Sequence, residues 1–189
     1  PGYREETTAQ VSWLSRACHS IGMPLPEVLI TEWNADHGAG WDNWHETIES
    51  LSLIEGMATA GVDAAVYYTY ARMLGQSGLS PIGRAFQYLD AMTGVQIGVS
   101  VTGGHHALAT RDENGSVHIL FWNSEGRHDA ATIRVENGAF LQASVDLLTE
   151  NGLGLTAQQQ RVGHSGLQVA FPDAGRAVGH VVFTSEPAS

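Results

Sequence analysis

The residues with the clearest chemical potential follow a short, mostly apolar run at positions 28–31. That run ends in the carboxylate of Glu32, and a loop rich in polar and aromatic groups comes next, including Trp33, Asn34, His37 and Trp41. A carboxylate at the end of a strand can take part in catalysis. It can equally be an exposed loop acid or the partner of an arginine, and these readings stay open on the residue types alone.

The elements that would position Glu32 alternate between helix and buried strand over residues 1–93. Apolar spacing predicts helices near 5–20, 43–60 and 81–93, and continuous apolar runs predict strands at 27–32 and 64–70. Asn43 followed by Glu46 has the spacing of a capping box, and Ser80-Pro81 is typical of a helix start. Such alternation predicts a parallel sheet with helical crossovers.

Two parallel strands cannot close a barrel. A complete (β/α)8 barrel has eight strands and needs about 250 residues. We therefore interpret residues 1–93 as the last two β/α units of a longer barrel. Groups at the carboxyl ends of barrel strands face the active site, which is where this interpretation places Glu32. It also predicts that the two strands lie side by side and parallel, with Glu32 and Tyr68 at the same end. Their outer edges should expose apolar surface.

Residues 94–189 have a different pattern, with short strands and glycine-containing turns such as Asp112-Glu113-Asn114-Gly115. About seven short strands with regular turns favour an antiparallel β-sandwich as a second domain. The fold class is thus α/β plus all-β. The expected strands are 95–102, 106–112, 116–123, 131–137, 140–149, 166–172 and 179–185.

The run from Ile30 to Asn34 resembles the seventh-strand nucleophile motif of clan A glycoside hydrolases, especially families 39, 51 and their relatives. Residues 62–70 resemble the eighth strand of the same barrels, and residues 115–123 are similar to a sandwich strand of family 39 enzymes. The order of barrel end, last helix and sandwich also agrees with family 39, so the resemblance covers almost the whole chain.

The resemblance implies a retaining glycosidase that uses two carboxylates. Glu32 matches the nucleophile, which must remain ionised to attack the sugar. The acid/base residue of the family follows the fourth strand in an Asn-Glu pair, and this sequence contains no such pair. We therefore expect the isolated chain to be inactive and to require the missing N-terminal part of the same barrel.

Substrate-binding residues follow from the same resemblance and from the chemistry of sugar stacking. Tyr68 stands where the family commonly has a tryptophan beneath the sugar, and Tyr70 would share its strand face. An aromatic residue in a buried strand can instead belong to the core, and Arg72 stands where related enzymes often have an acid. The remaining candidates are Trp33, Asn34, His37 and Trp41.

Composition argues against two classes of partner, whereas a carbohydrate substrate is what the resemblance implies. The net charge is −11, and all nine basic residues are arginines, which argues against binding to nucleic acid or to an anionic membrane. No apolar run approaches the roughly 18 residues of a membrane span. The histidines are scattered without ligand spacing, and Cys18, expected to be a buried helix thiol, is the one cysteine. We expect no metal and no cofactor.

Two other readings compete with the glycosidase fragment. In the first, the chain is a non-catalytic carbohydrate-binding or structural module whose working part is the sandwich. In the second, it is a family member that has lost catalysis.

Overall fold

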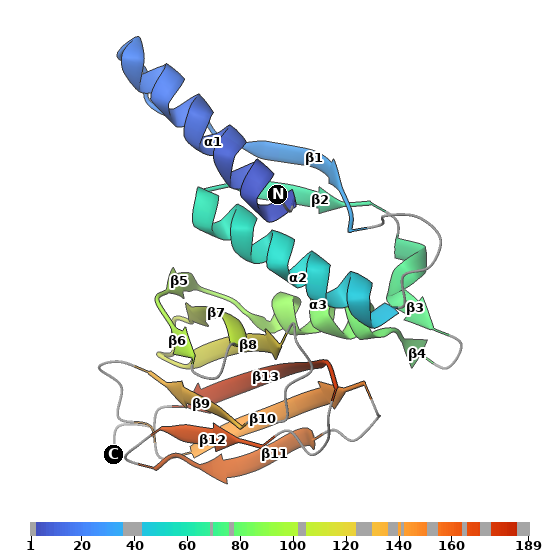
Figure 1. The fold of residues 1–189 in the computed structure, drawn as a ribbon. Coiled ribbons are helices and arrows are strands. Elements are labelled where there is room, and N and C mark those ends of the chain that lie inside the picture. The colour runs from blue at the N-terminus through green and yellow to red at the C-terminus, as the bar shows by residue number, and fades with distance from the viewer. Residues whose placement is uncertain are drawn as a thin grey trace. The chain divides into compact units, whose positions relative to one another are not determined.

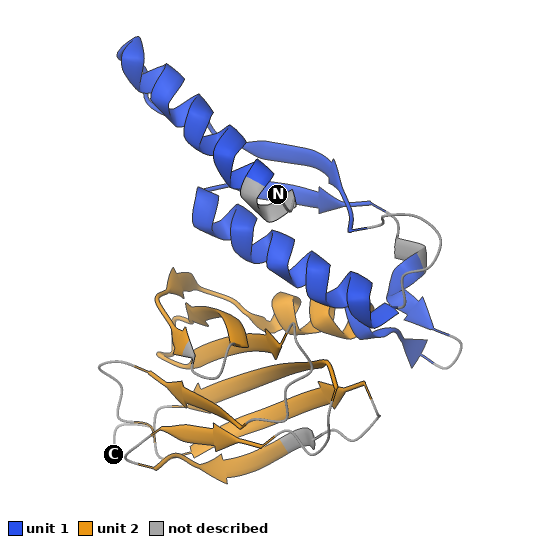
Figure 2. Ribbon diagram, viewed as in Figure 1, with its two compact units in different colours: residues 1–82 blue, residues 83–189 orange. Residues whose placement is uncertain are grey.

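The computed structural model divides the chain into two compact units, residues 1–82 and 83–189 (Figure 2). The division falls after Ile82, whereas the sequence pattern places it after Thr93, so the last helix groups with the strands that follow it. The structure describes residues 3–35, 43–68, 70–75, 78–101, 105–123, 130–135, 140, 142–150, 155–163, 166–170 and 175–184.

The first unit begins with helix α1 (Tyr3–Ser20), which ends where the sequence predicts. Gly22 adopts a φ of 72°, and the N–H of Met23 donates to the carbonyl of Cys18 over 2.9 Å, a common helix C-terminal arrangement. The Cys18 thiol is buried, as expected. The other elements of this unit are β1 (Leu29–Trp33), α2 (Asn43–Ala60), β2 (Ala64–Tyr67), η1 (Tyr70–Met73), β3 (Leu74–Gly75) and β4 (Gly78–Leu79).

Strands β1 and β2 pair in parallel, which confirms the predicted side-by-side arrangement (Figure 1). Leu29 lies opposite Ala64, and Trp33 lies opposite Tyr67, with a bulge between Ile30 and Trp33. The Asp63 carboxylate accepts the N–H of Val28 over 2.8 Å at the amino end of the pair. This parallel register brings the carboxyl ends of both strands to one edge.

The prediction that both strands are buried on two faces is wrong. Ile30 and Trp33 pack against Leu53 and Met57 of α2, but Leu29 and Val66 are 57% and 61% exposed. A two-stranded sheet has one face for the helix, and no described residue covers the opposite face. The two strands therefore expose apolar surface on the face away from α2.

Helix α3 (Pro81–Ala91) begins directly after Ser80, as the Ser-Pro signal predicts. The Ser80 side chain is buried and its hydroxyl donates to the carbonyl of Arg72 over 2.6 Å. Its backbone N–H donates to the carbonyl of Met73. Ser80 therefore ties the helix start to η1.

The second unit contains two antiparallel sheets (Figure 1). The larger sheet has the order β11-β10-β13-β8-β7-β5 and the smaller one β12-β9-β6. The expected strand 95–102 is split, because β5 joins the larger sheet and β6 the smaller. The strands are β5 (Val95–Ile97), β6 (Ser100–Val101), β7 (His105–Arg111), β8 (Val117–Asn123), β9 (Ala131–Arg134), β10 (Gln142–Thr149), β11 (Leu155–Arg161), β12 (Leu167–Val169) and β13 (Ala177–Thr184).

One apolar core joins the two sheets of the second unit. Phe121 of the larger sheet and Ile133 of the smaller sheet belong to the same cluster, and each is 0% exposed. A Cβ added at Gly179 would lie 2.3 Å from the Phe121 ring, so the aromatic ring rests directly on the neighbouring strand. Packing this close leaves no room for a larger side chain at Gly179.

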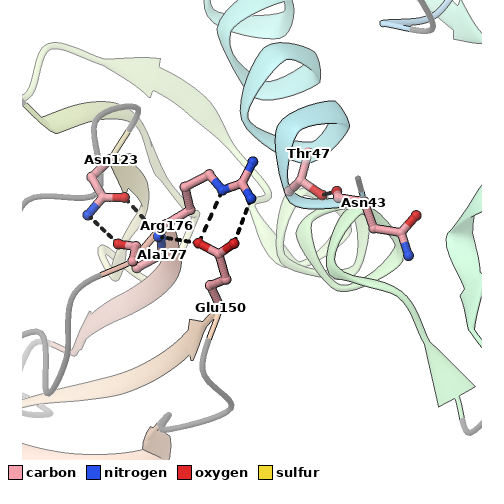
Figure 3. Close-up of polar contacts among 7 residues, drawn as sticks. Asn43, Thr47, Asn123, Glu150, Arg176 and Ala177 are labelled. Carbon is pink, nitrogen blue, oxygen red and sulfur yellow. Dashed lines mark hydrogen bonds and ion pairs between the residues drawn. The ribbon is translucent and has the colours of Figure 1, made fainter. Parts of the chain in front are cut away.

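Side-chain contacts also hold the start of β13 in place. The Asn123 side chain accepts the N–H of Ala177 over 2.9 Å and donates to the carbonyl of Gly175 over 3.2 Å (Figure 3). Next to it, the guanidinium of Arg176 binds both carboxylate oxygens of Glu150, with the shorter contact at 2.6 Å (Figure 3). These contacts hold the segment that leads into β13.

The larger sheet carries polar groups on the face that α3 covers. The Tyr88 hydroxyl donates to Asp146 over 2.8 Å, and the Tyr88 ring stacks on His180 at 5.5 Å between ring centroids. His180 stacks in turn on His118, whose Nε2 lies 3.5 Å from Asp112. Burial and the nearby charge of His118 lower the pKa of His180 to about 4, although the charge of Asp146 opposes them.

Candidate active site

Glu32 lies at the carboxyl end of β1, and its side chain is exposed. Trp33 packs toward α2, and successive side chains of a strand point to opposite faces. A bulge between Ile30 and Trp33 interrupts this alternation, and Glu32 stands exposed within it. An acid placed there is accessible to a ligand at the edge of the sheet.

Tyr68 directly follows β2 and is 54% exposed. Its N–H donates to the carbonyl of Trp33 over 2.7 Å, which fixes the Tyr68 backbone beside the residue after Glu32. The Tyr67 side chain points toward α2, whereas Tyr68, which follows the end of β2, is exposed. The structure thus brings Glu32 and Tyr68 together at one edge.

Trp33 occupies a different environment from the sugar-stacking position that its loop suggests. Its ring packs among Ala35, Leu53 and Met57 and meets the edge of Tyr67 at a centroid distance of 4.9 Å. It is half-buried on the helix side of the strands. In this position Trp33 packs between the carboxyl end of the strands and α2. Asn34, which is also half-buried, follows it at the start of the loop.

Glu46 is the residue that sequence reasoning missed. The spacing of Asn43 and Glu46 correctly predicts the start of α2, but it does not predict that the Glu46 side chain is 1% exposed. Its carboxylate accepts the Tyr67 hydroxyl over 2.9 Å and pairs with Arg72 over 3.0 Å. The hydroxyl of Thr47, the next residue, donates to the Asn43 carbonyl in the same first turn (Figure 3).

A spacing signal for Glu46 does exist. Glu46, Ser50, Leu53 and Met57 recur at intervals of four, three and four residues, and all four are buried. That is the period of one helix face, so Glu46 continues the apolar stripe of α2. An acid within such a stripe requires buried partners, which here come from residues more than twenty positions further along the chain.

The electrostatics of this cluster mark Tyr67 as a neutral hydrogen-bond donor. Burial raises the pKa of Tyr67 well above its usual value, and the hydrogen bond and negative charge of Glu46 raise it further. The positive charge of Arg72 acts in the opposite direction. Tyr67 therefore keeps its proton and its bond to Glu46 over the whole range in which most enzymes work.

Three predicted residues cannot be placed in the same detail. His37 and Trp41 lie outside the described residues, as does the Tyr70 side chain. The backbone of Tyr70 begins η1, because β2 ends at Tyr67. The inference that Tyr70 shares a strand face with Tyr68 is therefore wrong.

Two searches of the described residues concern other kinds of site. No group of three His, Cys, Asp or Glu side chains within the described ranges is close enough together to hold a metal ion. None of the described helices is both long enough and apolar enough to cross a bilayer. Among the described residues, the carboxyl end of the strand pair offers the exposed carboxylate of Glu32 and the exposed phenol of Tyr68.

Solved structures similar to this chain are glycoside hydrolases. CelM2, a bifunctional glucanase-xylanase from a metagenome library, matches 93% of this chain with a TM-score of 0.69 and 17% identity. A family 30 endoxylanase from Clostridium papyrosolvens C71 matches 88% with a TM-score of 0.62 and 15% identity. A family 44 endoglucanase from Clostridium acetobutylium matches 92% with a TM-score of 0.62 and 13% identity. The chain has the fold of part of these enzymes.

The match covers 34%, 43% and 35% of those three enzymes, so this chain spans well under half of their length. No family model matches the sequence, and no curated protein matches it. The likeness therefore concerns the fold.

Proposed function

We propose that this chain is the C-terminal part of a retaining glycoside hydrolase that cleaves O-glycosidic bonds of oligo- or polysaccharides. One observation carries the proposal: Glu32 and Tyr68 are both exposed at the carboxyl end of a parallel strand pair. In (β/α)8 barrels, that end of the strands holds the catalytic groups. In this proposal the second unit is the β-sandwich domain that follows the barrel.

In the proposed reaction, Glu32 attacks the anomeric carbon and forms a glycosyl-enzyme intermediate. A second carboxyl group, about 5–5.5 Å away in enzymes of this kind, protonates the leaving oxygen and then activates water. That second group would come from barrel strands preceding the present residues. Without it the isolated chain should show no turnover.

Substrate binding is assigned around Glu32. Tyr68 offers an exposed aromatic face and a hydroxyl for stacking and hydrogen bonding. The loop between β1 and α2 would add Asn34, His37 and Trp41, and η1 would add Tyr70. Trp33 would act from beneath, through its packing against Tyr67.

A groove of about 660 Å³ between α1 and β1 supports the idea of a barrel completed by further strands. Gln10, Leu14 and Val28 line it, and so do Trp13 and Leu29, which are 65% and 57% exposed. Apolar surface of this kind is normally covered in a stable protein. We assign it to the barrel strand that would precede α1.

The alternative of a carbohydrate-binding module in the second unit has less support. Proteins hold sugars on exposed aromatic faces, and every aromatic side chain described in residues 83–189 is buried or half-buried. In the first unit, by contrast, Tyr68 is more than half exposed. This difference supports placing the proposed site in the first unit.

The test uses the longest protein that carries this sequence, incubated with a fluorinated glycoside that traps the covalent intermediate. We expect mass spectrometry to find the sugar on Glu32 and expect Glu32→Gln to lower kcat by about 10³-fold or more, as loss of a catalytic nucleophile does. Glu27→Gln is the matched control, because Glu27 is also exposed but precedes the amino end of β1. Unchanged activity of Glu32→Gln would contradict the proposal.

A further inference from the structure

The buried carboxylate of Glu46 lies where three elements around the proposed site meet. It sits in the first turn of α2, which continues directly from the loop that leaves β1 after Glu32. Its two partners come from the end of β2, through Tyr67, and from η1, through Arg72. One side chain thus connects the far end of the β1 loop to the segment that carries Tyr68.

A chain of contacts leads from Glu46 to the proposed nucleophile. The carboxylate receives the Tyr67 hydroxyl over 2.9 Å, and the Tyr67 ring meets the Trp33 ring edge-on at 4.9 Å. Trp33 is the residue after Glu32, and its carbonyl accepts the N–H of Tyr68 over 2.7 Å. Any rotation of Tyr67 would therefore disturb the backbone on both sides of the site.

Burial of the Glu46 carboxylate costs free energy. A carboxylate that is 1% exposed loses its hydration, and pairs of this kind are often no more stabilising than well-packed apolar residues of the same size. What a buried ionic pair supplies instead is a single geometry, because both partners must meet the carboxylate oxygens at fixed angles. Fixed geometry at this place is useful to an active site.

We propose that Glu46 is a positioning residue, which holds the Tyr67–Trp33 pair and thereby sets the direction in which Glu32 and Tyr68 project. This inference rests on the proposed function and adds a residue to it. Glu46 itself makes no contact with the sugar, because its oxygens are occupied on the helix side of the strands. Its effect passes through Tyr67.

Tyr67→Phe is the most direct test, because it removes the hydroxyl that meets Glu46 and keeps the ring that meets Trp33. The second unit offers a control in Tyr88→Phe, which likewise removes one partly buried tyrosine–carboxylate bond, that to Asp146 over 2.8 Å. Both variants should lose similar stability. In the full-length enzyme we expect kcat to fall about tenfold in Tyr67→Phe, with KM nearly unchanged, and to stay constant in Tyr88→Phe.

A second pair of variants separates positioning from folding. Glu46→Met combined with Arg72→Met removes the whole ion pair and retains side-chain volume, so the double variant should fold. We expect it to keep the thermal transition within a few degrees and to lose kcat by about ten- to a hundredfold. A folded double variant with wild-type kcat would overturn the inference, and so would an unchanged kcat in Tyr67→Phe.

The outcomes also distinguish this inference from the function on which it rests. If Glu32→Gln abolishes turnover while both sets of Glu46-cluster variants leave it intact, only the positioning role is wrong. If Glu32→Gln remains active, the proposed function is wrong and the positioning role falls with it. On the chain itself, Glu46→Gln should lower the pKa of Tyr67 in an ultraviolet titration, whereas exposed Glu49→Gln should not.

Discussion

The strands of the two units differ in how many of their faces are buried. In the second unit, β8 and β13 have side chains buried on both faces, because a second sheet lies on one side and α3 reaches the other. In the first unit, β1 and β2 are covered by α2 alone, and Leu29 and Val66 stand exposed. The contrast teaches that strands packed on both faces and strands packed on one face occur in the same chain, and that the exposed apolar face belongs to β1 and β2.

The largest expected effect is a difference between matched core and face substitutions. Phe121→Ala should lower the free energy of unfolding by about 3–5 kcal/mol, because a fully buried ring leaves a cavity. Val66→Ala should change it by no more than about 0.5 kcal/mol, since Val66 is 61% exposed. Urea unfolding followed by circular dichroism measures both. A loss above about 2 kcal/mol for Val66→Ala would mean that its face is covered after all.

The next largest effect depends on pH and should be confined to the second unit. The pKa of His180 falls from 6.5 to about 4 on folding, so the unfolded chain binds a proton more readily than the folded one. Stability contributed by neutral His180 is therefore present above pH 6.5 and is lost as the pH falls toward 4, by at most about 3 kcal/mol. The groups facing His180 are His118, Asp146 and Tyr88.

Hydrogen exchange of peptides from β8 and β13, measured between pH 4 and pH 7, follows this effect locally. In His180→Phe the acid-induced loss of protection should shrink, because the titrating ring is gone. His19→Gln provides the control, since His19 is exposed on α1. Equal acid sensitivity in the wild type and His180→Phe would rule out the predicted linkage.

The smallest effect compares ion pairs from the two units. Glu150 and Arg176 keep 34% and 19% of their side chains exposed, so Glu150→Gln should cost below about 1 kcal/mol. Glu46→Gln should cost clearly more, because Glu46 is 1% exposed. Thermal unfolding in low and high salt checks the difference, since salt should weaken the Glu150 pair more than the pair whose carboxylate is buried, although Arg72 itself is 37% exposed. Equal costs would show that burial does not separate the two pairs.

Hydrophobic periodicity predicts most of the helices and strands, and the elements that it misses or merges have physical causes. Strand β11 was missed because Gln158, Gln159 and Gln160 give it no apolar alternation, and an edge strand needs none. Strands β5 and β6 were merged because nothing in their sequence marks the change of sheet near Gly98. Periodicity reports burial within a single element and says little about which sheet that element joins.

The candidate site was predictable to a similar extent. The parallel strand pair and the meeting of Glu32 with Tyr68 follow from the order of elements, because parallel strands end at a common edge. The burial of Glu46 does not follow from that order, since its partners Tyr67 and Arg72 reach it only through the tertiary structure. Trp33 was taken for a loop aromatic because the bulge that turns it toward α2 leaves no signature in the sequence.

The side-chain amide of Asn123 makes the second unit sensitive to deamidation. It is 2% exposed, and it uses its oxygen and its nitrogen on opposite partners, the N–H of Ala177 and the carbonyl of Gly175. Deamidation to aspartate would leave two oxygens, one of them facing a carbonyl that it would repel. A single slow chemical change at this position would therefore loosen the entry to β13 while leaving every apolar contact in place.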